Sequence, residues 1–149
     1  MALHQPDMAP NVGAILRLGA CLGFPVHVIE PCGFAFSARA WRRQAMDYAE
    51  LAEIHRHDSW ARFLAERPPG RLVAMTTRGA ESLWDFAFHP GDTLLMGSEG
   101  AGLPDAAHAA ADARLVIPLC PGARSLNLAM AAAIAAAEAG RQLAGLRRA

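Results

Sequence analysis

Short apolar runs alternate with segments of helical periodicity along almost the whole of this chain. Runs of β-branched and aliphatic residues that end in Gly, Pro or polar turns are typical of strands. Because strands that alternate with helices form a parallel sheet covered by helices, the sequence predicts an α/β domain with a mostly parallel sheet flanked by helices. The expected strands are residues 2–4, which look like a clipped first strand, 25–31, 51–55, and the beginnings of segments 71–79, 92–104 and 113–125.

Several of the intervening segments are expected to be helices. Residues 9–24 place apolar side chains at helical spacing, with Asn11 as a candidate N-cap and Gly23 as a candidate stop. Residues 58–67 begin on an Asp-Ser pair suited to capping, and the basic segment 37–50 is expected to mix helix and loop. The last helix lies within 122–140 and is mostly alanine, the best helix former, with Ser125 or Asn127 as its cap.

The composition fits a single domain of residues 1–149. Hydrophobic residues make up 53% of the chain, which is ample for a core, yet no apolar run is long enough to cross a bilayer. The first residues lack the basic start and long apolar stretch of a signal peptide, which favours a cytoplasmic protein. The three cysteines include no C-x-x-C pair and the six histidines show no ligand spacing, so neither disulfides nor a metal site is expected.

The charged residues exclude some kinds of binding surface and some kinds of catalytic site. Fourteen basic and fourteen acidic residues give a net charge of zero, which argues against a surface coated in basic charge but allows a local basic patch. Every basic residue is an arginine. The chain therefore has no lysine for a Schiff base or for a phosphate-binding loop of the G-x-x-x-x-G-K type.

Polar or glycine-rich loops follow three of the expected strands, at 75–79, 97–102 and 117–127. The carboxyl ends of parallel strands meet at one edge of a sheet, where α/β proteins bind their ligands. Each loop alone could be ordinary turn chemistry, whereas three loops on one edge favour a pocket. Residues 97–102 have the pattern G-x-x-G-x-G, so a nicotinamide dehydrogenase with G-x-G-x-x-G is a poor match. The loops suit a nucleoside-like ligand, bound by backbone groups and enclosed by apolar side chains.

Three motifs follow one another in the order typical of the SPOUT RNA methyltransferases: N-x-G-x-x-x-R from Asn11, G-x-E-x-x-G-L-P from Gly97, and I-P…S-x-N-L from Ile117. Over nearly its whole length the chain resembles the small stand-alone branch that methylates the ribose 2′-oxygen of the tRNA wobble nucleotide, a cytidine or a uridine. The resemblance implies S-adenosyl-L-methionine as the cofactor. It also implies a C-terminal segment threaded as a deep trefoil knot, and a homodimer with tRNA bound across the subunits.

The resemblance also assigns cofactor-binding residues in the three loops. Apolar side chains there would cover the faces of adenine, while loop N–H and C=O groups would contact its edges. The alanine helix would be slim enough to pack closely in the knot and against the partner subunit, although plain helix propensity explains the same composition. The implied cofactor-binding residues are Met75, Gly97, Ile117, Leu119, Ser125 and Asn127.

Three residues are candidates for catalysis. In the family the early motif arginine, here Arg17, acts at the reacting ribose. A guanidinium is too basic to lose its proton in a protein, so Arg17 is expected to grip an RNA phosphate and position the 2′-oxygen. Glu99 is expected to orient Arg17 or contact the substrate, and Asn11 completes the set. The alternatives are a surface charge for Arg17, a solvated turn acid for Glu99 and a helix cap for Asn11.

RNA binding is predicted for Arg39, Arg42 and Arg43 beside Trp41, because arginine binds phosphate and stacks on bases. Arginines near the C-terminus could equally be ordinary solvated charges.

The chain departs from the family where relatives carry bulky aromatic residues late in the last helix, at Ala137 and Gly140. Besides wobble methylation, two functions stay open: the same reaction at another tRNA position or on rRNA, and cofactor and RNA binding without catalysis.

Overall fold

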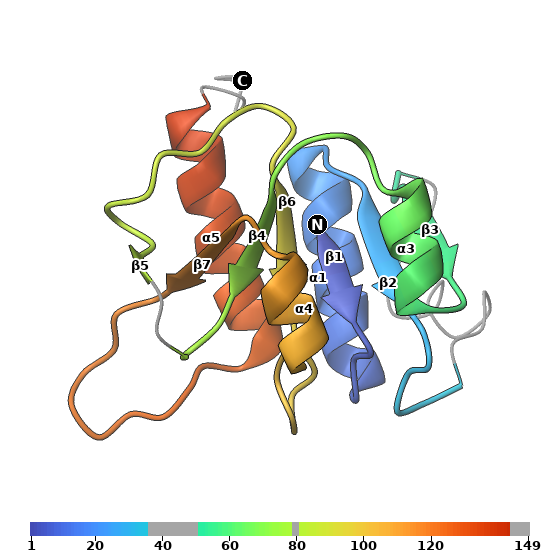
Figure 1. Ribbon diagram of the computed structural model, residues 1–149, viewed down its shortest axis with the longest axis horizontal. Coiled ribbons are helices and arrows are strands. Elements are labelled where there is room, and N and C mark those ends of the chain that lie inside the picture. Colours follow the sequence, from blue (N-terminus) through green and yellow to red (C-terminus); the bar gives the residue numbers. More distant parts are fainter. Residues whose placement is uncertain (36–50, 79–80, 144–149) are drawn as a thin grey trace.

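A computed structural model describes residues 1–35, 51–78 and 81–143. Within them a seven-stranded sheet has the strand order β3-β2-β1-β6-β4-β7-β5, all neighbours are parallel, and helices cover both faces (Figure 1). The predicted α/β class with a parallel sheet is confirmed. The strands are β1 Ala2–His4, β2 Val26–Ile29, β3 Ile54–His57, β4 Leu72–Met75, β5 Glu81–Ser82, β6 Thr93–Met96 and β7 Ala113–Val116. The helices are α1 Ala9–Leu22, α3 Trp60–Glu66, α4 Asp105–Ala110 and α5 Leu128–Gln142.

The short strand β1 is an interior strand, third in the order of the sheet. Leu3 is in register with Val28 of β2 on one side and with Met96 of β6 on the other. All three residues of β1 are buried. The prediction of a strand at residues 2–4 is therefore confirmed, and this strand joins the two halves of the sheet.

Alternate residues of the strands face opposite layers of helices. Leu3 and Val28 belong to the core cluster that packs α1 and α5 onto one face of the sheet. Ala2 and Ile29 belong to the cluster beneath α3 and α4 on the other face. Strands buried on both faces are apolar almost throughout, as β4 and β6 are. The outer strands β3, β5 and β7 carry exposed polar residues.

The alanines of α5 lie where the helix meets the rest of the chain. Ala132 and Ala135 are fully buried, and Ala136 is nearly so. The helix packs against α1 and β6. Small side chains on this face let the helix axis come close to its neighbours, so close packing within the chain accounts for part of the alanine content. Packing against a second subunit stays a prediction.

The start of α1 differs from the prediction. Met8, not Asn11, is at the N-cap position, and Pro10 lies in the first turn, where its fixed φ is suited to a helix. The interpretation of Asn11 as a cap is wrong, because the helix begins before it and its side chain is buried. Gly23 ends the helix as predicted, with φ of 73° and its N–H donated to the carbonyl oxygen of Gly19.

Other boundaries also shift. Ser59 caps α3 through its hydroxyl, as the Asp-Ser pair predicted. The strand predicted at 51–55 is wrong in its bounds, since β3 begins at Ile54. Neither β5 nor α4 was predicted, because β5 has two residues and pairs only with β7, and α4 is a six-residue alanine-rich helix without a side-chain cap. The prediction of helix and loop at 37–50 lies outside the described residues.

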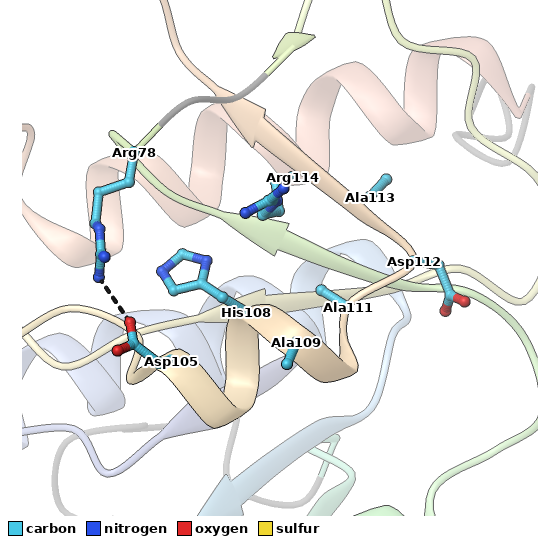
Figure 2. A pocket seen from close by; sticks show the side chains of 8 residues that line it. All are labelled: Arg78, Asp105, His108, Ala109, Ala111, Asp112, Ala113 and Arg114. Carbon is cyan, nitrogen blue, oxygen red and sulfur yellow. Dashed lines mark hydrogen bonds and ion pairs between the residues drawn. The ribbon is translucent and has the colours of Figure 1, made fainter.

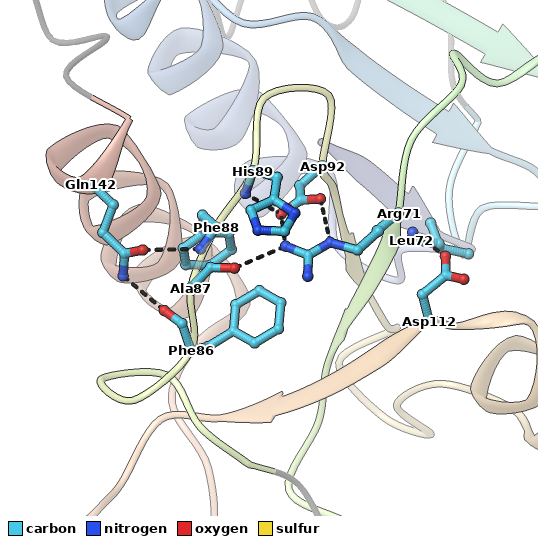
Figure 3. Close-up of polar contacts among 9 residues, drawn as sticks. All are labelled: Arg71, Leu72, Phe86, Ala87, Phe88, His89, Asp92, Asp112 and Gln142. Carbon is cyan, nitrogen blue, oxygen red and sulfur yellow. Dashed lines mark hydrogen bonds and ion pairs between the residues drawn. The ribbon is translucent and has the colours of Figure 1, made fainter.

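Polar contacts fasten the segment before β6 to β4 and to the end of α5 (Figure 3). The guanidinium of Arg71 donates to both carboxylate oxygens of Asp92, at 2.9 and 2.6 Å. Gln142 donates to the carbonyl oxygen of Phe86 and accepts from the N–H of Phe88, each at 2.9 Å. The contacts of Gln142 therefore tie the end of α5 to the segment before β6.

A histidine-rich layer lies between β2, β3 and α3. The rings of His27 and His57 are joined by a 3.0 Å contact between Nδ1 and Nε2, and His27 also stacks on His55 with ring centroids 4.7 Å apart. The edge of Phe63 approaches His27 from α3. Burial is the main cause that lowers the pKa of His27, to about 4, and the nearby N-terminal amine and the two histidines add to it.

We expect this layer to make folding stability depend on pH. An unfolded histidine titrates near pH 6.5, so the folded state binds fewer protons between about pH 6.5 and 4. The contribution of His27 is fully present above pH 6.5 and falls by about 3 kcal/mol as the pH drops to 4. Urea unfolding of the wild type and of His27→Gln, which cannot titrate, should show the two free energies converging as pH falls. Parallel pH profiles would contradict this assignment.

Candidate functional site

The three predicted loops border one pocket at the carboxyl ends of β4, β6 and β7. Its volume is about 600 Å³, within the range of small-molecule sites. Two of the predicted catalytic residues, Asn11 and Glu99, also line it. The third, Arg17, is exposed on α1 and is not among the lining residues. The structure brings together in this pocket all six residues predicted to bind the cofactor: Met75, Gly97, Ile117, Leu119, Ser125 and Asn127.

The loop after β6 folds tightly back on itself. Ser98 and Gly102 exchange backbone hydrogen bonds of 3.0 and 3.2 Å, and Gly102 has φ of 71°. A Cβ on Gly97 would lie 2.4 Å from the backbone carbon of Gly102 and 2.5 Å from the nitrogen of Leu103. Neither backbone atom can rotate away, so Gly97 is required for the fold of this loop as well as for its place in the pocket wall.

A chain of side-chain hydrogen bonds runs beneath the pocket. Asn127 caps α5 through Oδ1, which accepts from the N–H groups of Ala129 and Met130. Its Nδ2 donates to Oδ1 of Asn11 at 3.0 Å, and Nδ2 of Asn11 donates to Oε1 of Glu99 at 2.8 Å. Of the two predicted caps, Ser125 and Asn127, the structure selects Asn127. The amide of Asn11 is oriented from both sides.

The second carboxylate oxygen of Glu99 is also engaged. Oε2 accepts the N–H of Asp7 at 2.6 Å, while the carboxylate of Asp7 accepts the N–H of Gly100 at 2.9 Å. Glu99 therefore clamps the β1–α1 connection to the glycine-rich loop. It is not a solvated turn acid, and its catalytic role stays a prediction.

The pocket wall combines apolar side chains with polar loop groups. Met75, Met96 and Leu128 are almost fully buried around it. Thr76 and Thr77 follow β4 at its rim, next to the backbone of the glycine-rich loop. Apolar faces for a flat ring, with N–H and C=O groups for its edges, match the chemistry of an adenosine group.

Sequence reasoning missed several residues of this site. Met8 lines the pocket from just before the early motif, Leu126 from between the predicted residues Ser125 and Asn127, and Met96 from the end of β6. Asp7 was missed because its partners Glu99 and Gly100 lie 92 and 93 residues away. The proline-aspartate pair before the early motif was the available clue.

The predicted RNA-binding residues Arg39, Arg42 and Arg43 lie outside the described residues. Two other arginines, Arg78 and Arg124, stand at the rim instead. Within the described residues, no three His, Cys, Asp or Glu side chains are grouped to hold a metal ion. In that same part of the chain, no helix has the length and hydropathy needed to cross a membrane.

Comparisons with known proteins agree with this geometry. Residues 1–137 match the SpoU rRNA Methylase family. The chain belongs to this family. A relative from Beijerinckia indica, a tRNA (cytidine(34)-2'-O)-methyltransferase, is 49% identical over 99% of this chain and 94% of its own length.

Solved structures similar to this chain have the same fold. One, described as giving insights into the 2-OH methylation of C/U34 on tRNA, has a TM-score of 0.90 and 43% identity over 97% of this chain and 95% of its own. An rRNA methyltransferase from Sinorhizobium meliloti with bound AdoMet has a TM-score of 0.82 and 29% identity. It covers 95% of this chain, which spans 55% of that protein.

Substitutions at Asn127 separate capping from the hydrogen-bond chain. Asn127→Ala is expected to lower the free energy of unfolding by about 1–2 kcal/mol, because the cap is lost. Asn127→Asp keeps the oxygen that caps α5, so we expect near-normal stability. It replaces the donor Nδ2 with an oxygen that cannot donate to Oδ1 of Asn11, so we expect binding of S-adenosyl-L-methionine to weaken about tenfold. Urea unfolding and calorimetric titration measure the two effects. Wild-type affinity in Asn127→Asp would show that the chain of hydrogen bonds does not shape the pocket.

Proposed function

We propose that this protein methylates the ribose 2′-oxygen of nucleotide 34, the wobble nucleotide of tRNA, with S-adenosyl-L-methionine as methyl donor. One observation carries the proposal: a pocket suited to an adenosine group lies in a chain that matches a tRNA (cytidine(34)-2'-O)-methyltransferase over 99% of its length. A tRNA substrate also agrees with the cytoplasmic location expected from the sequence.

When bound, S-adenosyl-L-methionine supplies an electrophilic methyl group on a positively charged sulfur. Met75, Ile117 and Leu119 would cover the adenine, and the loop beginning at Gly97 would offer backbone N–H and C=O groups. Ser125 and Asn127 would complete the binding residues, at the start of α5. Holding two reactants in line supplies much of the rate of such a reaction.

Arg17 would act on the RNA in this proposal. Its guanidinium stays protonated and binds a phosphate next to the target ribose, so that the 2′-oxygen is held in place and its proton leaves to water. Glu99 and Asn11 would act by holding the pocket together. Because Arg17 lies outside the pocket of its own chain, the proposal includes the homodimer, in which RNA contacts both subunits.

Exposed apolar side chains support a subunit interface near the pocket. Met8 is 51% exposed and Met130 is 63% exposed, at the starts of α1 and α5. The C-terminal knot is part of the same proposal. Its support is the resemblance to the SPOUT methyltransferases, whose C-terminal segment is threaded through a loop.

The deciding experiment is transfer of labelled methyl groups to bulk tRNA and to rRNA, followed by location of the modified nucleotide. Label at position 34 of tRNA is the expected result. Label at another tRNA position or in rRNA would show that the reaction is the proposed one but the target nucleotide is different. The similarity to an AdoMet-bound rRNA methyltransferase favours this alternative. No transfer to any RNA would favour a binding protein without catalysis.

A further inference from the structure

We propose that a hollow beside α4 binds a phosphodiester of the RNA substrate through Arg78, His108 and Arg114. The inference rests on the proposed function in one respect: it takes RNA as the substrate. The hollow has a volume of about 500 Å³ and lies between α4, the start of β7 and the loop after β4. Figure 2 shows the ring of His108 between Asp105 and Arg114, with Arg78 reaching in from that loop.

The first observation that points to a ligand is the lack of hydrogen-bond partners around the imidazole of His108. Both of its ring nitrogens are buried, and neither has a hydrogen-bond partner among the described residues. Buried polar groups in proteins are nearly always paired, and an exception calls for an absent partner such as an ion. A phosphate oxygen in the hollow would accept a hydrogen bond from an imidazole N–H.

Arg114 supplies a second group for a ligand: it is exposed and its guanidinium has no protein partner among the described residues. It is in register with Ala74 of β4, so its side chain stands on the same sheet face as α4. Within residues 1–35, 51–78 and 81–143, Arg114 makes no hydrogen bond or ion pair. A guanidinium fork with all donors available matches the oxygens of a phosphate.

The two acidic residues that line the hollow equal its two arginines in number, but each carboxylate already has a partner of its own. Asp105 pairs with Arg78 at 3.3 Å, and both side chains are mostly exposed, so water and phosphate compete easily with this contact. Asp112 points away from the other polar groups in Figure 2, and its Oδ2 accepts the N–H of Leu72 at 2.7 Å. Among the side chains that point into the hollow, the guanidinium groups of Arg78 and Arg114 therefore stand with one carboxylate, that of Asp105.

The position of the hollow fits an extended RNA strand. Arg78 lines both this hollow and the pocket proposed for S-adenosyl-L-methionine. A phosphate bound here would lie next to the cofactor without entering its pocket.

Two substitutions test the proposal in the full-length protein. Arg114→Ala should weaken tRNA binding about tenfold and reduce the slope of log affinity against log salt by about 1, the effect of one lost phosphate contact. His108→Leu should weaken tRNA binding while raising the unfolding temperature, because it removes unpaired polar atoms from a buried position. If His108 had only a structural role, its replacement would not weaken tRNA binding while raising the unfolding temperature. Arg62→Ala, an exposed arginine on α3, is the matched control and should bind as the wild type does.

Fluorescence anisotropy with tRNA at several salt concentrations measures affinity, and calorimetry should show unchanged binding of S-adenosyl-L-methionine. Wild-type affinity and slope in both variants would overturn the proposal. The proposal would also be overturned if the substitutions changed only the oligomeric state measured by sedimentation, because the hollow would then be an interface with another protein subunit. Mapping of the methylated nucleotide is independent: methylation away from position 34 refutes the proposed function, while loss of affinity in the variants still supports this phosphate site.

Discussion

Gly97→Ala is expected to abolish measurable binding of S-adenosyl-L-methionine. The added Cβ would lie 2.4 Å from the backbone of Gly102, far inside van der Waals contact, and the mutual hydrogen bonds of Ser98 and Gly102 leave the loop no room to yield. The loop must open, and with it the pocket wall. We also expect the free energy of unfolding to fall by about 1–3 kcal/mol, as in other overpacked sites.

Gly100→Ala is the control for this substitution. It adds the same methyl group to the same loop, where it would meet only Oδ2 of Asp7, at 3.3 Å, and that carboxylate can move. Calorimetric titration should detect binding by Gly100→Ala and none by Gly97→Ala. Equal affinities in the two variants would mean that the loop is not held in the closed form described above.

Arg17→Ala is expected to lower kcat/KM for tRNA methylation by about 10²-fold or more, the scale of losing the alignment of a reacting group. Affinity for S-adenosyl-L-methionine should stay at the wild-type value, because Arg17 does not line the pocket. Arg17→Lys keeps the charge and loses the fork of donors, so it should recover part of the rate. Single-turnover methyl transfer measures the effect separately from product release.

The outcome also separates positioning from proton transfer. If Arg17 positions the substrate as a permanent cation, the pH profile of methyl transfer in Arg17→Lys should keep the shape of the wild-type profile. A new ionisation near the lysine pKa would instead show that this residue exchanges a proton during the reaction. Full activity in Arg17→Ala would remove Arg17 from the proposed mechanism.

Local sequence patterns were sufficient to predict the class of fold and the edge that holds the pocket. The apolar runs at 71–75, 92–96 and 113–117 predict strands, and the polar loops that follow them in the sequence lie at the carboxyl ends of these parallel strands. The trefoil knot and the residue roles came from the resemblance and remain proposals.

What the patterns could not predict depends on contacts between distant residues. Asn11 has the sequence context of a cap, and only its contacts with Glu99 and Asn127, 88 and 116 residues away, reveal its place beneath the pocket. The two-residue strand β5 exists because β7 offers an open edge, which no local propensity encodes. His108 likewise looks like an ordinary helix residue until its surroundings are known.

The position of β1 between β2 and β6 has a consequence for how the chain folds during its synthesis on the ribosome. One side of β1 can pair with β2 early, but the other side has no partner until Thr93–Met96 has been synthesised. A nascent chain shorter than this presents an open strand edge, a template for pairing with other chains. Truncated or stalled products of this gene should therefore aggregate or require chaperones, whereas the finished chain closes the gap itself.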